Sequence, residues 1–266
     1  MRAIELNAVA VDQNKAAFTW GRRAAHDPAS VQRLLTTAQV ISLPARRQNL
    51  DDLVQRRVEF LTAYQDAAYA QRYSAMVERV RQAELAVSPR TELAETVARN
   101  LFKLMAYKDE YEVARLHTDA AFSQKIDSLF EGSYKLVHHL APPLFSRKDA
   151  KGHLIKSRYG AWIRSAFSVL ARFKGLRGTA FDVFGYTEER RGERALIGRY
   201  MDTLEELMVG LSASSLPAAV EVAAVAEQIK GFGHVKARNL EAALPLWEAR
   251  LQAFRDTARG GQREAA

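Results

Sequence analysis

One long helical pattern constrains the fold of this chain more than any other feature of its sequence. It opens near Ser88-Pro89, where Ser88 suits an N-cap and Pro89 suits the first helical position, and it is predicted to run on to Asp119. Its apolar residues recur at spacings of four, four and three, as on one face of an α-helix: Leu93, Val97, Leu101 and Leu104. The chain is therefore expected to be mainly α and to be organised around this helix.

A carboxylate interrupts the neighbouring apolar row of that helix. Asp109 falls in line with Phe102, Met105, Val113 and Leu116, where an apolar residue is expected. A buried carboxylate has to be paired, hydrogen-bonded or hydrated, because burying it bare is too costly.

Further polar and aromatic residues surround it in the sequence: Tyr107, Lys108, Tyr111, Arg115 and His117. Two interpretations remain open. The first is a polar helix face with a Glu112–Arg115 pair, and the second is a polar pocket or subunit contact built on this helix.

A second candidate site lies at residues 231–238. Gly231 and Gly233 precede a helix start and leave backbone N–H groups free, and three side chains add donors: His234, Lys236 and Arg238. Such a segment can hold an anion. It is neither a Walker loop nor a G-x-G-x-x-G motif, and the alternative is a C-cap glycine within a tight turn between two helices.

A change of period predicts a small β-hairpin near residues 133–158. Residues 134–140 alternate as a strand does, and a basic turn at 147–152 leads into the returning segment. Neighbouring strand residues point to opposite faces, so His138 and His139 are not expected to bind one metal ion together.

Helical periodicity covers most of the remaining sequence. It predicts helices over residues 2–20, 28–37, 49–84, 160–173, 187–211 and 215–229, and a last helix that ends near residue 256. Gly21 is expected to end the first of these helices, and Thr187 is expected to cap the fifth. Pro245 is expected to kink the last helix or make it restart. The apolar segment 179–186 is expected to pack on the core as a linker.

Composition excludes several kinds of site. The chain has no cysteine, which rules out disulfides, thiolate zinc sites, cysteine-ligated iron–sulfur clusters and a cysteine nucleophile. Its net charge is +8, but the arginines come as scattered pairs among acidic residues, so an acidic protein is a better match than nucleic acid. With no signal peptide and no run of 18 apolar residues, the cytoplasm is the expected location, and a membrane is not an expected partner.

Three long blocks carry a family resemblance: RNLFKLMAYKDEYEVARLHTD at 99–119, FGYTEERR at 184–191 and GFGHVKARN at 231–239. In this order they resemble the C-terminal region of bacterial indolepyruvate ferredoxin oxidoreductases. These are large fused 2-oxoacid:ferredoxin oxidoreductases that use thiamine diphosphate. The resemblance covers nearly the whole chain.

The resemblance implies a division of the chain. Residues 1–75 would be a helical remnant of the γ-type oxidoreductase α/β domain, residues 76–257 the helical domain that follows it, and residues 258–266 a disordered tail. The complete enzyme would decarboxylate an aryl 2-oxoacid, form an acyl-coenzyme A and pass electrons to ferredoxin. Thiamine diphosphate, Mg²⁺, the iron–sulfur cluster and coenzyme A are implied for that enzyme, with no cofactor bound by this chain.

Motifs of an independent active site are missing. The sequence has no GDG block, no G-x-S-x-G elbow, no H-E-x-x-H pair and no P-loop. On one helix, Asp109 and His117 would lie about 12 Å apart, too far to share a proton. An enzyme that uses either residue would need a pocket there with perturbed pKa values.

Assembly is therefore the expected function of this chain. We expect it to dock on the catalytic domains, with coenzyme A or ferredoxin as a further contact, and to be inactive alone. The alternative is a standalone basic helical protein that binds a polyanion such as nucleic acid.

Overall fold

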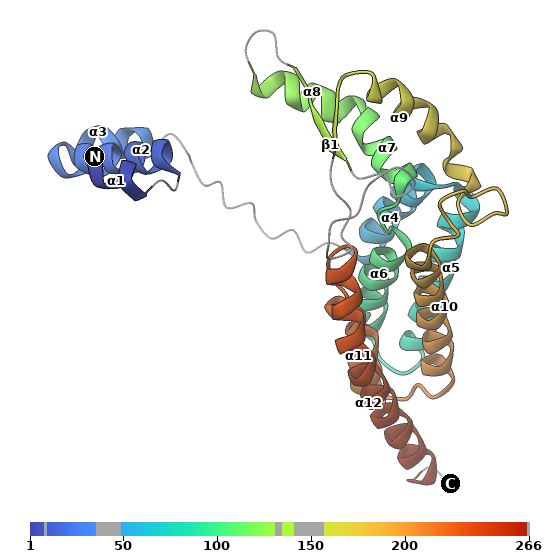
Figure 1. Cartoon of the computed structure of the whole chain (residues 1–266). Helices are drawn as coiled ribbons and strands as arrows, with labels where there is room; N and C mark the ends of the chain where they lie inside the picture. Colours follow the sequence, from blue (N-terminus) through green and yellow to red (C-terminus); the bar gives the residue numbers. More distant parts are fainter. Residues whose placement is uncertain (8–9, 36–48, 131–134, 141–156, 265–266) are drawn as a thin grey trace. The chain divides into compact units, whose positions relative to one another are not determined.

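The computed structural model describes residues 1–7, 10–35, 49–130, 135–140 and 157–264. The chain divides into two compact units, Met1–Arg47 and Gln48–Ala266. Their described parts are helical apart from one two-stranded antiparallel sheet, which confirms the predicted mainly α fold (Figure 1). The predicted division at residues 75 and 76 falls inside a helix of the second unit.

The first unit holds three helices: α1 (Arg2–Asn7), α2 (Val11–His26) and α3 (Pro28–Leu35). The single helix predicted over residues 2–20 is wrong, because Ala10 adopts the left-handed conformation with φ of 46° and breaks it. Gly21 lies within α2 and does not end it. The helix stops at His26 because Asp27 precedes a proline, which disfavours helical geometry in the residue before it.

The core of the second unit lies among six helices: α4 (Leu50–Tyr64), α5 (Ala67–Leu85), α6 (Glu92–Met105), α10 (Glu188–Val209), α11 (Leu216–Ala224) and α12 (His234–Glu264). They pack side by side in Figure 1 around large buried side chains that include Trp247 and Phe254. Buried tyrosines donate to backbone carbonyls across the core, as Tyr73 does to Ala98 and Tyr200 to Ala223, both over 2.9 Å. The hydroxyls of these tyrosines are thus satisfied inside a closely packed core.

A smaller layer packs against one end of these helices. It consists of α7 (Glu110–Thr118), α8 (Ala120–Leu129), β1 (His138–Leu140), β2 (Ser157–Tyr159), α9 (Ile163–Arg172) and the 3₁₀ turn η1 (Phe173–Leu176). Ile163 and Phe167 of α9 pack on Ala114 of α7 and form a second, smaller core.

The predicted hairpin is confirmed in its strands. His138 pairs with Tyr159 in antiparallel register, and His138 is buried whereas His139 is exposed, so the two histidines face opposite sides as expected. The predicted basic turn at 147–152 lies outside the described residues.

The predicted helix from Ser88 to Asp119 is wrong in two places. It begins only at Glu92, because the carboxylate of Glu84 accepts the backbone N–H groups of Leu93 and Ala94, each over 2.8 Å, and takes the capping role expected of Ser88. It also breaks between α6 and α7. There Asp109 becomes the N-cap of α7 and accepts the N–H of Glu112 over 2.9 Å.

Other predicted helices are closer to the structure. The segment 49–84 forms α4 and α5, separated where Asp66 caps α5 by accepting the N–H of Tyr69. Thr187 caps α10 as predicted. The helix predicted over 215–229 is α11 followed by the 3₁₀ turn η2 (Val225–Gln228). Helix α12 continues through Pro245 without a restart and reaches Glu264, so the described part of the predicted tail is helical.

Within the part of the chain that the structure describes, no helix is both long and apolar enough to cross a membrane.

Candidate docking site

Asp109, the carboxylate that interrupted an apolar row, is paired with Arg177. Arg177 Nε and Nη2 donate to the two carboxylate oxygens over 2.5 and 2.9 Å, and the side chains of Arg177 and Asp109 are only 2% and 3% exposed. Nη1 of Arg177 donates to the carbonyl oxygen of Tyr64 over 2.7 Å, at the end of α4. The sequence identified the need for a partner, but not Arg177, which lies 68 residues away.

The Arg177 guanidinium also lies over an aromatic ring. Its central carbon is 3.6 Å from the centroid of the Tyr64 ring, a cation–π contact. Burial lowers the pKa of Arg177, but the hydrogen bonds to Asp109 and the nearby Tyr64 outweigh burial, and the net direction is upward. Arg177 therefore stays charged and holds α4, η1 and the start of α7 together.

The two predicted tyrosines belong to the same cluster. Tyr107 is buried, its carbonyl oxygen accepts the hydroxyl of Tyr64 over 2.8 Å, and burial raises its pKa. Tyr111 donates to Asp182 Oδ1 over 3.2 Å, and burial followed by the charge of Asp182 raises its pKa. Both hydroxyls thus keep their protons. This part of the predicted site is a closed bonded cluster.

Asp182 organises the loop that links η1 to α10. Its carboxylate is buried and accepts the N–H groups of Gly178 and Gly185 over 2.8 and 3.0 Å, in addition to the Tyr111 hydroxyl. Arg194 of α10 donates to the carbonyl of Gly185 over 2.6 Å. The backbone between residues 178 and 187 is thereby wrapped around a charged group.

The expectation that segment 179–186 packs on the core is wrong. Its carboxylate points inward, whereas Phe181 is 76% exposed and Val183 and Tyr186 are also exposed. The physical reason is that the backbone N–H groups of this loop satisfy Asp182, so the side chain with the highest desolvation cost is the one best accommodated inside. Among the large apolar side chains of this loop, Phe184 turns inward, edge-on to the ring of Tyr111.

Arg115 and His117, the other residues predicted on this helix, have separate surroundings. Arg115 makes two hydrogen bonds to Glu112, each over 2.8 Å, so the polar pair offered as one interpretation is present. The His117 ring lies against those of His138 and Phe167, with centroids 5.0 and 5.4 Å away. Burial lowers the pKa of His117, and the neighbouring His138 and Lys108 lower it further.

Asp109 and His117 therefore do not form an acid–base pair. The carboxylate is bonded to Arg177, and the imidazole packs on β1 and α9.

The second predicted region forms the turn before α12. Gly231 and Gly233 have φ angles of 98° and 54°, which favour glycine, and the turn presents Phe232 with 70% of its surface exposed. Lys236 pairs with Glu193 of α10. His234 and Arg238 lie exposed in the first turns of α12.

The structure brings the two predicted regions together at Lys108. Its Nζ lies 5.9 Å from the centroid of the Phe232 ring. Beside them, Lys103 donates to the carbonyl oxygens of Ala226 and Glu227 over 2.9 and 3.1 Å.

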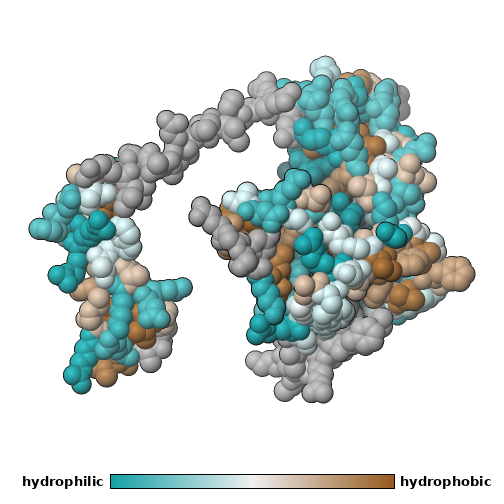
Figure 2. All heavy atoms as spheres, turned by 90° about the horizontal axis from the view of Figure 1, so that it is seen from above, coloured by the Kyte–Doolittle hydropathy of each residue, from teal (hydrophilic) through white to brown (hydrophobic). Residues whose placement is uncertain are grey.

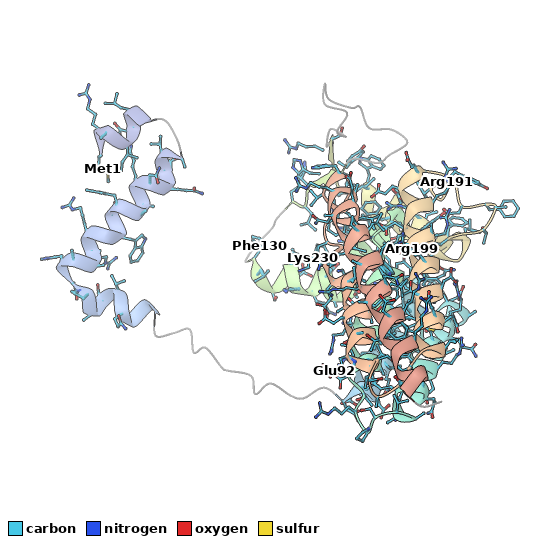
Figure 3. The ribbon with its side chains drawn as sticks, turned by 90° about the horizontal axis from the view of Figure 1, so that it is seen from below. Met1, Glu92, Phe130, Arg191, Arg199 and Lys230 are labelled. Carbon is cyan, nitrogen blue, oxygen red and sulfur yellow. The ribbon has the colours of Figure 1, made fainter. Side chains whose placement is uncertain are left out.

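Burial lowers the pKa of Lys103, and the positive charges of Lys230 and Lys236 lower it further. Lys103, Lys108, Lys230 and Lys236 are called the lysine cluster below. Lys230 is labelled in Figure 3, at the residue that precedes this turn.

The first unit has apolar surface of its own. None of the side chains described in it is buried, and Leu6, Phe18 and Trp20 are exposed large apolar residues. Lys15 of α2 pairs with Glu5 of α1. Helices α1 and α2 therefore present large apolar side chains to solvent.

The part of the chain that the structure describes shows no cluster of metal ligands. Among the described residues, no three His, Asp or Glu side chains come together as a metal site, and the sequence has no cysteine. The residues present thus do not fit an iron–sulfur cluster. Whether another part of a larger enzyme supplies the implied cofactors stays a prediction.

A comparison with protein families identifies one match. The model of a family of unknown function (DUF6537) matches residues 50–249, which span the second unit from α4 into α12. No curated protein and no solved structure matches the chain.

Proposed function

The chain belongs to the DUF6537 family, a family of unknown function, and we propose that it is an assembly and docking module of a larger oxidoreductase. The three sequence blocks that resemble indolepyruvate ferredoxin oxidoreductases support the choice of enzyme class. On this proposal the complete enzyme oxidatively decarboxylates an aryl 2-oxoacid to an acyl-coenzyme A and passes the electrons to ferredoxin. It acts in the cytoplasm, and its thiamine diphosphate, Mg²⁺ and iron–sulfur cluster lie on other domains.

The first unit carries this proposal. Its described helices bury no side chain, while Leu6, Phe18 and Trp20 are exposed. A helical unit of this size gains little stability by itself, and its large exposed apolar side chains are available for contact with a partner. Packing these side chains on the catalytic domains would remove them from water and order the unit.

The Asp109 and Asp182 clusters fit a scaffold that positions surfaces for contact. Their charged groups are bonded to each other and to the backbone, so the proposal gives them no part in proton transfer. The purified chain alone is therefore expected to show no reduction of an electron acceptor that depends on a 2-oxoacid.

The decisive experiment is co-purification with the catalytic segment from the same genome. Wild-type chain should associate with that segment, and the pair should turn over an aryl 2-oxoacid with coenzyme A. Trp20→Asp should weaken the association at least tenfold, because it places a charge in the proposed contact.

Thr19→Asp is the matched control for Trp20→Asp. It adds the same charge one residue away, at a polar position whose hydroxyl bonds to the backbone of Lys15, and it should bind nearly as well as wild type. Absence of association by wild-type chain would overturn the proposed function.

The lysine cluster favours one second candidate, binding of a polyanion such as nucleic acid. The positive charges gathered around Lys103 would attract phosphate groups, and the exposed ring of Phe232 could stack on a base. Binding of a mixed-sequence oligonucleotide should then fall steeply with salt, and Lys230→Gln should reduce the slope. A docking module should instead bind the oligonucleotide weakly at every salt concentration.

A further inference from the structure

Helix α9 is apolar on two neighbouring faces. One face, with Ile163 and Phe167, packs on α7. The other consists of exposed residues at spacings of four, three and four, which share one side of a helix: Trp162, Ala166, Val169 and Phe173. Trp162 is 63% exposed, and Val169 and Phe173 are at least half exposed. A helix that only covered the core would not need this second apolar face.

The exposed face of α9 continues along the chain into the loop around Asp182. From η1 the chain enters residues 178–187, where Phe181, Val183 and Tyr186 are exposed. Figure 1 shows this loop projecting beside α9 and α10, and Figure 2 shows apolar side chains in brown at that edge of the second unit. These apolar residues of α9, η1 and the loop are called the α9 face: Trp162, Ala166, Val169, Phe173, Phe181, Val183 and Tyr186.

The loop presents its apolar side chains on an ordered backbone. Asp182 fixes the backbone from within, and the Tyr186 hydroxyl donates to the carbonyl of Ala180 over 2.7 Å. A bulkier residue would not fit at Gly185, because a Cβ atom there would overlap the Asp182 carboxylate. A surface that is already ordered loses little conformational entropy on binding.

The exposed charges on and beside α9 are mainly basic. The described charged residues between positions 157 and 181 are all basic: Arg158, Arg164, Arg172, Lys174 and Arg177. Arg177 among them is buried and paired with Asp109. Asp182, the next acid, is buried, and Glu188 and Glu189 follow only in the first turn of α10. Arg158 and Arg172 are exposed, and Arg191 lies just beyond the loop (Figure 3).

The basic charge beside the α9 face favours one kind of binding partner over another. A second copy of the chain seated on the same face would bring arginines against arginines, which opposes association, whereas an acidic surface would be attracted. The four-three-four spacing is the pattern with which one helix packs on another.

We propose that the α9 face docks an acidic amphipathic helix of a protein partner. Apolar side chains of that helix would pack between Trp162, Val169 and Phe173 and against the loop, and its carboxylates would meet Arg158 and Arg172. Aromatic residues with an arginine rim are typical of the positions that dominate binding energy. This inference rests on the proposed docking function. It identifies the surface that docks and the chemistry of the partner.

The test uses the full chain and the catalytic segment from the same genome, with affinity measured by calorimetry. Val169→Asp and Arg172→Glu should each weaken binding at least tenfold, and wild-type affinity should fall as salt rises because the partner is acidic. Val209→Asp is the matched control, since Val209 is 88% exposed at the far end of α10, and it should change affinity less than twofold. All three positions are exposed, so circular dichroism and urea midpoints should match wild type.

The outcomes separate the two proposals. If wild-type chain does not bind the segment, both the docking function and this inference fail. If wild type binds and Val169→Asp and Arg172→Glu bind equally well, only the inference fails.

Two other binding partners of the α9 face, a second copy of the chain and a membrane, can be distinguished by experiment. A dimer of the chain alone that Val169→Asp abolishes would identify a second copy as the occupant. Binding to vesicles with anionic lipids that Phe181→Asp abolishes would identify a membrane surface. Either result would overturn the acidic helix.

Discussion

The helical core and the loop at residues 178–187 place their side chains in opposite ways. In the core, apolar residues such as Leu101 and Trp247 are buried, and most charged residues lie outside. In the loop, the carboxylate of Asp182 is buried while Phe181 and Val183 are exposed. Hydropathy predicts the first arrangement and fails for the second.

The difference shows when a charged side chain can be buried. A carboxylate can lie inside when donors already arranged by the fold satisfy it, as Gly178, Gly185 and Tyr111 do for Asp182. The neighbouring apolar side chains remain exposed to solvent because the backbone N–H groups of the loop turn inward to bond this carboxylate. Such an inversion is a feature of surfaces that bind partners.

Breaking the buried pair beside that loop should give the largest effect. Arg177→Ala leaves Asp109 buried without a partner charge, and we expect a loss of about 3–5 kcal/mol in the free energy of unfolding, measured with urea. Arg79→Ala is the control, because it removes an exposed pair with Glu205 and should leave stability nearly unchanged. A loss for Arg177→Ala as small as that of the control would mean that the pair does not hold this region together.

The core also contains a buried carboxylate at Glu84. Glu84→Ala removes the acceptor for the N–H groups of Leu93 and Ala94, and we expect a loss of about 1–3 kcal/mol in urea unfolding. Thr91→Ala is the control, since Thr91 precedes α6 without a capping hydrogen bond from its side chain. Equal losses from the two variants would show that Glu84 is not the cap.

Substitution of two glycines by alanine compares how closely the loop and helix α10 are packed. Gly185→Ala should destabilise the protein by about 1–3 kcal/mol, because its Cβ would overlap the Asp182 carboxylate. Gly198→Ala in α10 has open space and should stabilise it by about 0.5–1 kcal/mol, since alanine is the better helix former. Thermal unfolding of both variants should shift in opposite directions, and a shift in the same direction would contradict the close packing around Asp182.

The smallest effect should be a change in pH dependence at the second core. The pKa of His117 is lowered by burial, so the unfolded chain takes up this proton more readily than the folded chain. Stability should therefore decline as pH falls below about 6.5, the ordinary pKa of histidine, toward the lowered value. In urea unfolding between pH 7.5 and 5.5, His117→Phe should decline less than wild type.

His139 provides the control for that experiment, because it is exposed on the same hairpin. His139→Phe should keep the wild-type slope. If His117→Phe keeps that slope as well, protonation of His117 does not weaken the contact between α7 and the hairpin.

Much of the fold was determined by the sequence alone. Local patterns predicted the mainly α class, the hairpin strands and the Thr187 cap, and offered the Glu112–Arg115 pair on α7 as one of two interpretations. These features depend on residues close in sequence, where periodicity and capping act. The same reasoning showed that Asp109 needs a partner.

Contacts between distant residues depend on how the chain packs. Arg177 is 68 residues from Asp109, Lys108 meets Phe232 across the chain, and Asp182 turns inward because distant and local donors converge on it. The predicted long helix breaks before Asp109 because capping α7 and binding Arg177 satisfy that carboxylate better than a helical position would. Such partners depend on how the chain packs, and no local pattern in the sequence specifies them.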